Sequence, residues 1–154
     1  MLHYLTVPVT AFQQNCSIVW CDETRDAAVI DPGGDLDVLL AEIEQRGLHL
    51  TQILQTHAHI DHAGATGELA DSLKLPIIGP HPADQFWIDG LPHQSQMFGF
   101  PPARAFTPTR WLYDGDTVSV GHSTLQVRHC PGHTPGHVVF YSPQIKRAFV
   151  GDVL

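Results

Sequence analysis

The sequence contains no long apolar segment, few cysteines and few basic residues. No apolar run approaches the roughly 18 residues that a membrane-spanning helix needs, and the first residues lack the basic and apolar stretches typical of a secretory signal. The three cysteines, Cys16, Cys21 and Cys130, do not suggest a disulfide framework. These features predict a cytoplasmic protein with reduced thiols and no membrane partner.

Acidic residues outnumber basic ones. The 154 residues include 8 Lys and Arg against 16 Asp and Glu, which gives a formal net charge of −8. Because an acidic surface repels a phosphate backbone, we expect no nucleic-acid partner. Hydrophobic residues make up 43% of the chain, which is enough to build the packed core of one globular domain.

The hydrophobic pattern predicts strands and helices in a layered α/β domain. A helix is expected to begin at the cap residue Asp35 and to end at Gly47, and a second is expected over residues 63–74. The proline-rich and aromatic stretch 80–109 predicts loops and short helices packed on the core, with a flap over a substrate site as the alternative. Strands are expected over residues 3–9, 15–21, 26–31, 52–55, 111–113, 117–120, 124–128, 137–141 and 147–150.

Histidine is the abundant residue. Six of the 11 histidines fall within residues 57–62 and 129–137, and imidazoles clustered beside carboxylates are typical of a metal site. Within these clusters, His129 and His137 are expected to support the ligands or to pack in the core. The isolated histidines are expected to be solvated: His3, His49, His81, His93 and His122.

The segment Thr-His-Ala-His-Ile-Asp-His, residues 56–62, follows a predicted strand. In an extended chain His57 and His59 point to the same side, so both can bind one ion. Asp61 and His62 come where the chain turns into a helix, and their side chains can diverge toward a second ion. Four metal-binding groups within six residues therefore favour two adjacent ions over one.

Two later segments add further candidate ligands. Residues 130–137 read Cys-Pro-Gly-His-Thr-Pro-Gly-His, and the prolines and glycines predict a tight loop that presents His133. A strand then ends at Asp152. Loops at one rim of a layered domain commonly assemble a site. A nucleophilic role for Cys130 is disfavoured, because His133 is better explained as a metal ligand than as a base. Asp31-Pro-Gly-Gly predicts only a turn from strand to helix.

These motifs resemble the ordered signature of the metallo-β-lactamase superfamily: His57-x-His59-x-Asp61-His62, then Gly132-His133-Thr134, then Gly151-Asp152. Residues 8–16, 29–34 and 130–137 are moreover similar to short bacterial glyoxalase II-like hydrolases, also called hydroxyacylglutathione hydrolase-like. The resemblance covers the whole chain. It implies an α/β fold in the form of a four-layer αββα sandwich.

The resemblance also implies a dinuclear centre. His57, His59 and His133 would hold one ion, Asp61 and His62 would hold the second, and Asp152 would bridge both. Two zinc ions are expected, with iron or manganese as alternatives. Asp61 or Asp152 would orient the attacking water and take its proton, which makes these two carboxylates the candidate catalytic residues.

The implied reaction is hydrolysis of an acyl thioester such as S-D-lactoylglutathione by a hydroxide held at the metal centre. The expected partner is therefore a small thioester substrate linked to glutathione. Thioester chemistry agrees with the absence of an evident general acid in the sequence, because a thiol of pKa about 8.5 leaves readily as its thiolate.

The sequence departs from the family at its end. The family supplies one more histidine ligand after the bridging aspartate, whereas this sequence ends at Leu154. We therefore expect residues 1–154 to form a single metallo-hydrolase-like domain that is C-terminally incomplete, without its last strands, last helix and glutathione-binding residues. Two alternatives stay open: a mononuclear iron persulfide dioxygenase that uses His57, His133 and Asp152 as a facial triad, and a non-catalytic truncated fragment. The oligomeric state is left open.

Overall fold

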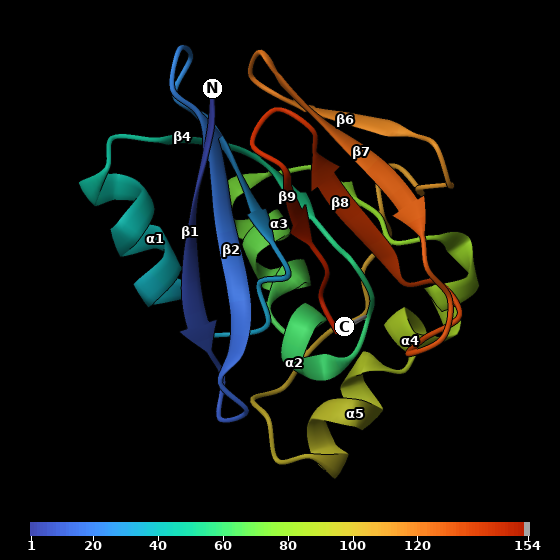
Figure 1. Cartoon of the computed structure of the whole chain (residues 1–154). Helices are drawn as coiled ribbons and strands as arrows, with labels where there is room; N and C mark the ends of the chain where they lie inside the picture. Colours follow the sequence, from blue (N-terminus) through green and yellow to red (C-terminus); the bar gives the residue numbers. More distant parts are fainter. Residues whose placement is uncertain (153–154) are drawn as a thin grey trace.

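The computed structural model describes residues 1–152, which form two β-sheets packed against each other (Figure 1). The first sheet has the order β1–β2–β3–β4–β5. Its first three strands are antiparallel, and β4 and β5 continue it in parallel with β3. The strands are β1 (Leu2–Val9), β2 (Gln14–Cys21), β3 (Asp26–Ile30), β4 (His49–Leu54) and β5 (Ile77–Ile78).

The second sheet is antiparallel throughout, in the order β6–β7–β8–β9. Its strands are β6 (Thr117–Val120), β7 (Ser123–His129), β8 (Val138–Ser142) and β9 (Arg147–Phe149). The helices are α1 (Leu36–Gln45), α2 (Ile60–Ala63), α3 (Thr66–Leu73), the 3-10 turn η1 (Pro82–Asp84), α4 (Gln85–Asp89) and α5 (Leu91–Met97).

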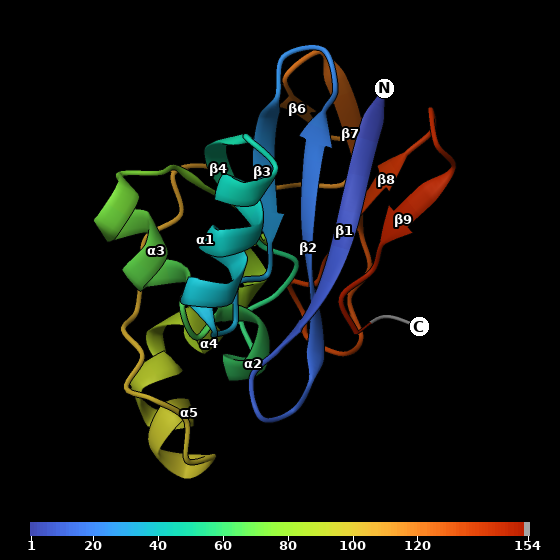
Figure 2. The same cartoon turned by 90° about the vertical axis from the view of Figure 1, so that its left-hand side faces the viewer.

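Figure 2 shows the layers: α1 and α3 lie on one face of the first sheet, and the second sheet lies on the other face. Strand β3 is buried on both sides. Ala28 and Ile30 pack between the two sheets with Phe140, whereas Ala27 and Val29 pack under α1. A strand that is buried on both faces is composed of a continuous run of apolar residues. This run explains why the strand could be predicted from the sequence. The expected sandwich is thus confirmed, with helix, sheet and sheet as its described layers.

Most predicted elements are confirmed, but two are wrong. The strand expected over 111–113 does not form. Leu112 instead lies outside regular secondary structure, and its backbone N–H donates to Pro80 O at 3.1 Å. The helix expected over 63–74 is split into α2 and α3, because the N–H of Ala65 turns away to donate to Pro32 O at 3.1 Å. No helix among residues 1–152 has the length and apolar character needed to cross a bilayer.

Asp35 occupies the N-cap position of α1 but does not act as a cap. Its backbone is left-handed, with φ 51°, and its side chain makes no hydrogen bond to the helix. The carboxylate instead accepts from the N–H of Thr10 at 2.9 Å. Asp35 therefore ties the start of α1 to the turn between β1 and β2.

One edge of the sandwich gathers the chain segments that carry the motifs. Strands β3 and β4 are parallel, so Asp31 and the loop after β4 leave the sheet at the same edge. The loop between β7 and β8 and the end of β9 reach this edge from the second sheet (Figure 1). The topology therefore brings residues 31, 57–62, 130–137 and 152 together.

Candidate metal centre

The first two candidate ligands lie in the loop that follows β4. His57 is fully buried, and His59 is the residue immediately before α2. Their rings meet edge to face, with centroids 5.1 Å apart. Both imidazoles therefore reach the same side of the loop, as an extended backbone between them requires.

Helix α2 carries the next two candidates. His62 is buried, and its ring centroid lies 4.3 Å from that of His57. Its Nε2 atom lies 3.7 Å from Oδ2 of Asp61. The turn into this short helix is what places Asp61 and His62 beside the two earlier histidines without pointing all four groups at a single position.

The loop between β7 and β8 contributes His133. The loop is closed by a hydrogen bond from Cys130 N to His137 O at 2.9 Å. At its tip, Nε2 of His133 lies 3.0 Å from Nδ1 of His59. Two ring nitrogens that come from segments 74 residues apart thus approach each other closely enough to bind the same ion.

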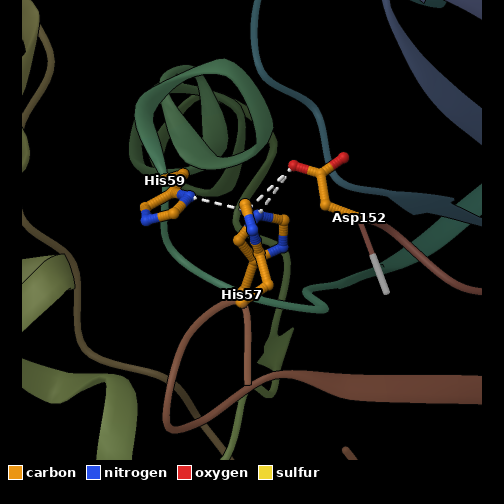
Figure 3. A group of neighbouring side chains, drawn as sticks. His57, His59 and Asp152 are labelled. Atoms are coloured by element: carbon orange, nitrogen blue, oxygen red, sulfur yellow. Dashed lines mark hydrogen bonds and ion pairs between the residues drawn. The ribbon is translucent and has the colours of Figure 1, made fainter. Parts of the chain in front are cut away.

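Asp152, which follows β9, lies at the centre of the group. Its Oδ2 atom lies 3.1 Å from His133 Nε2 and 3.6 Å from His57 Nε2, and its Oδ1 atom lies 3.2 Å from His62 Nε2. Figure 3 shows its carboxylate facing His57, with His59 on the other side of that ring. One oxygen therefore faces His133 and His57, and the other oxygen faces His62.

The donor atoms fall into overlapping groups that suit cations. The atoms within each group lie within 4.8 Å of one another. The ring Nε2 atom of His57 is buried and has no hydrogen-bond partner, and such an orphaned group costs about 1–3 kcal/mol unless something binds it. The buried Nε2 atom of His62 faces carboxylate oxygens of Asp152 and Asp61. A cation would satisfy the first nitrogen and balance the carboxylates around the second, so the residues fit a metal centre. The groups are His57, His59, His133 and Asp152; Asp61, His62 and Asp152; and Asp31, His57 and His62.

A buried carboxylate beneath the site sets the orientation of two histidines. Asp31 accepts from Nδ1 of His62 at 2.9 Å and from the hydroxyl of Thr56 at 2.5 Å. Because that hydroxyl donates to Asp31, it can only accept from Nδ1 of His57, which lies 2.9 Å away. Both rings thus keep a proton on Nδ1, and Nε2 is the atom that would bind a metal. The sequence predicts only a turn at Asp31, and its local pattern holds no signal for this role.

His137 supports the site, as expected. It is fully buried, its ring stacks on that of His57 with centroids 4.4 Å apart, and its Nε2 atom accepts from the N–H of Asp152 at 3.2 Å. His129 lies further out, where its Nε2 atom donates to Pro135 O at 2.9 Å.

The expectation that His81 is merely solvated is wrong. Its ring stacks on that of His129 with centroids 4.0 Å apart and an interplanar angle of 3°, and its Nδ1 atom accepts from Ala83 N. His93, in contrast, is exposed as expected. The stack joins segments 48 residues apart (129 − 81), a contact that no local pattern reveals.

Burial and neighbouring charges shift the pKa values of three residues at the site. Burial lowers the pKa of His59 to about 4, with help from His57 and His133. Burial also lowers the pKa of His62, but hydrogen bonds to Asp152 and Asp31 outweigh that effect and raise it to about 10. The contacts with His57 and His62 hold the pKa of Asp152 well below its usual range. Without a cation, His62 therefore supplies the positive charge between the carboxylates.

Comparison with known families adds a match that covers most of the chain. The model of the metallo-beta-lactamase superfamily matches residues 9–154. Hydroxyacylglutathione hydrolase GloC of Haemophilus influenzae is 45% identical over 149 residues, which are 96% of this chain and 70% of that protein. The hydroxyacylglutathione hydrolase of Bdellovibrio bacteriovorus is 32% identical over 153 residues, and this chain spans 53% of its length.

Solved structures agree with this match. The protein TTHA1623 in a di-iron-bound form is 37% identical with a TM-score of 0.86, over 97% of this chain and 72% of that chain. The B3 metallo-beta-lactamase BLEG-1 is 31% identical with a TM-score of 0.86, over 99% of this chain and 73% of that chain.

Proposed function

The chain belongs to the metallo-beta-lactamase superfamily, and on this premise we propose that it is a metal-dependent hydrolase of acyl thioesters such as S-D-lactoylglutathione. The observation that carries the proposal is the position of Asp152, whose carboxylate lies within 3.1–3.6 Å of Nε2 of His57, His62 and His133. The names of the relatives from Haemophilus influenzae and Bdellovibrio bacteriovorus support the substrate class.

We assign the ligands by the groups that their atoms form. His57, His59 and His133 would hold one cation, Asp61 and His62 would hold a second, and Asp152 would supply a carboxylate to both. When bound, two adjacent cations lower the pKa of a water to about 7 and stabilise negative charge that develops on a carbonyl oxygen. We favour zinc, and iron is the alternative that the di-iron-bound relative supports.

The chain's own residues prepare the attack. Asp31 and Thr56 keep the lone pairs of His57 and His62 directed at the centre through the hydrogen bonds described above. Asp61 has a side chain that is 18% exposed, so it can reach an incoming water, orient it and accept its proton. Asp152 is the second carboxylate in reach of that water. No acid is needed for the departing thiolate.

The second group of donors argues against a mononuclear iron persulfide dioxygenase. A facial triad needs only two histidines and one carboxylate, which His57, His133 and Asp152 supply. Asp61 and His62 then have no ligand role in a single-ion site, although Nε2 of His62 forms a donor group with Asp61 and Asp152, at 3.7 Å from Asp61 Oδ2 and 3.2 Å from Asp152 Oδ1. Two cations give these side chains a partner.

Thiol release from S-D-lactoylglutathione by the zinc-loaded protein tests the proposal. We expect turnover in the wild type, loss of turnover on chelation and in His59→Ala, and no change in His93→Ala, which removes an exposed imidazole. Oxygen uptake with glutathione persulfide is measured in parallel. Uptake without thioester turnover contradicts the hydrolase in favour of the dioxygenase, and metal binding without either activity favours the non-catalytic fragment.

A further inference from the structure

Asp84 is a fully buried carboxylate outside the ligand groups. It is the last residue of η1 and accepts three hydrogen bonds. Oδ2 accepts from the N–H of Ala58 at 3.0 Å and from the hydroxyl of Thr134 at 3.0 Å. Oδ1 accepts from the N–H of Gly136 at 2.7 Å. No basic side chain among residues 1–152 lies within ion-pair distance of it, so these donors are what compensates its burial.

The three donors belong to two different metal-binding loops. Ala58 lies between His57 and His59, whereas Thr134 directly follows His133. One carboxylate oxygen of Asp84 therefore bonds a residue of each loop. These two residues are the sequence neighbours of His59 and His133, whose Nδ1 and Nε2 atoms lie 3.0 Å apart.

The loop that carries His133 docks closely on η1. The N–H of His81 donates to Gly136 O at 3.1 Å. Together with the bond from Gly136 N to Asp84 Oδ1, it gives Gly136 two hydrogen bonds to the 81–84 segment. A Cβ atom at Gly136 would lie 2.5 Å from Asp84 N and 2.7 Å from Asp84 Cβ. Only glycine permits this approach, and the stacked rings of His81 and His129 close the same contact from outside.

A second side chain holds only one of the loops. Gln94 of α5 is buried; its Oε1 atom accepts from Ile60 N at 2.9 Å and its Nε2 atom donates to Ala58 O at 3.2 Å. Gln94 thus shapes the loop of His57 and His59, but makes no hydrogen bond to residues 130–137 among the described contacts. Of these two side chains, Asp84 is the one that reaches both loops.

We propose that Asp84 is a positioning residue of the metal centre, which holds the His57–His59 loop and the His133 loop at the separation that lets His59 and His133 bind the same cation. This inference rests on the proposed metal centre. It assigns to Asp84 no contact with substrate or metal; it acts through the backbone of Ala58 and Gly136 and the hydroxyl of Thr134.

Zinc affinity in Asp84→Asn tests the role. The amide has the size of the carboxylate, but its NH₂ group cannot accept a hydrogen bond, so at least one of the three hydrogen bonds that hold the two loops is lost. We expect zinc binding, measured by competition with a chromophoric chelator, to weaken about 10- to 100-fold. We also expect an altered absorption spectrum of the cobalt-loaded protein. Asp89→Asn removes the same charge from an exposed position nearby and is expected to leave both readouts unchanged.

Thr134 supplies a milder pair of variants. Thr134→Val removes only the hydroxyl donor and is expected to weaken zinc binding several-fold, whereas Thr134→Ser keeps the donor and is expected to retain wild-type affinity. If Asp84→Asn does not fold, the zinc affinities of Thr134→Val and Thr134→Ser decide whether Asp84 positions the loops.

Two failures are distinguishable. A wild-type protein that binds no zinc overturns the proposed function and the role of Asp84 with it. A wild-type protein that binds zinc, with equal affinity in Thr134→Val and in any folded Asp84→Asn, overturns the role of Asp84 alone. A merely structural residue would lower the melting temperature of these variants without changing zinc affinity or the cobalt spectrum.

Discussion

The imidazole of His62 donates from Nδ1 to the buried carboxylate of Asp31 across 2.9 Å. The two residues lie 31 positions apart, one after β3 and one in α2. Because a carboxylate only accepts, this contact places a ring proton on Nδ1 and turns Nε2 toward Asp152. The orientation of the His62 ring is therefore set by Asp31, at the edge of the first sheet.

Replacing Asp31 with asparagine is expected to weaken zinc binding about 10- to 100-fold, the range typical of residues that orient metal ligands. The amide can present its NH₂ group to His62, which favours the tautomer with the proton on Nε2. Asp37→Asn, on the exposed first turn of α1, is the matched control. Equal zinc affinity in the two variants, measured by chelator competition, would contradict the proposed role.

Zinc binding is expected to release protons at pH 7. Without a cation the pKa of His62 is about 10, so the ring is protonated, whereas a zinc ligand must be neutral. A raised pKa means that protons compete with the metal below pH 10. Apparent affinity should therefore rise with pH, by up to about tenfold per unit from this group. Titration calorimetry at pH 7 in two buffers of different ionisation enthalpy measures the release, and identical heats in both buffers would refute it.

Metal removal is expected to lower the melting temperature. A ligand that binds only the folded protein at about 1,000 times its Kd stabilises it by about 4 kcal/mol, which corresponds to about 10 °C for a chain of this size. Thermal unfolding with zinc and with a chelator measures the shift. His93→Ala should keep the full shift, and a full shift in His59→Ala would show that His59 is not a ligand.

Gly151 is expected to be essential for placing Asp152. Its φ is +55°, and a Cβ atom would lie 2.6 Å from Thr56 Oγ1 and 2.7 Å from His137 Nε2. Gly151→Ala should therefore displace Asp152 and weaken zinc binding at least about tenfold. Gly115→Ala separates backbone strain from this clash, because Gly115 also has a positive φ, of 86°, but has open space around it. Loss of zinc affinity in both variants would assign the effect to general destabilisation.

The sequence predicts which candidate ligands come together better than it predicts the residues that surround them. His57, His59, Asp61 and His62 lie within six residues, so their local backbone geometry already brings them together. His133 and Asp152 lie at loop and strand ends, where side chains of a layered domain converge.

The supporting residues could not be predicted in this way. Asp31, Asp84 and Gln94 are polar residues that each bond to a distant segment: Asp31 to Thr56 across 25 positions, Gln94 to Ile60 across 34, and Asp84 to Gly136 across 52. Nothing in their local pattern distinguishes them from ordinary turn or helix residues, because their role arises only when distant segments pack together. The split between α2 and α3 has the same origin, since Ala65 bonds to Pro32 across two segments.

The central claim is that three distant segments meet around two cations. A crystal structure of the zinc-loaded protein, with anomalous diffraction recorded at the zinc absorption edge, tests it most directly. The account predicts two peaks about 3.5–4 Å apart, with the carboxylate of Asp152 between them and His133 and His62 on opposite sides. A single peak, or peaks away from Asp152, would contradict it.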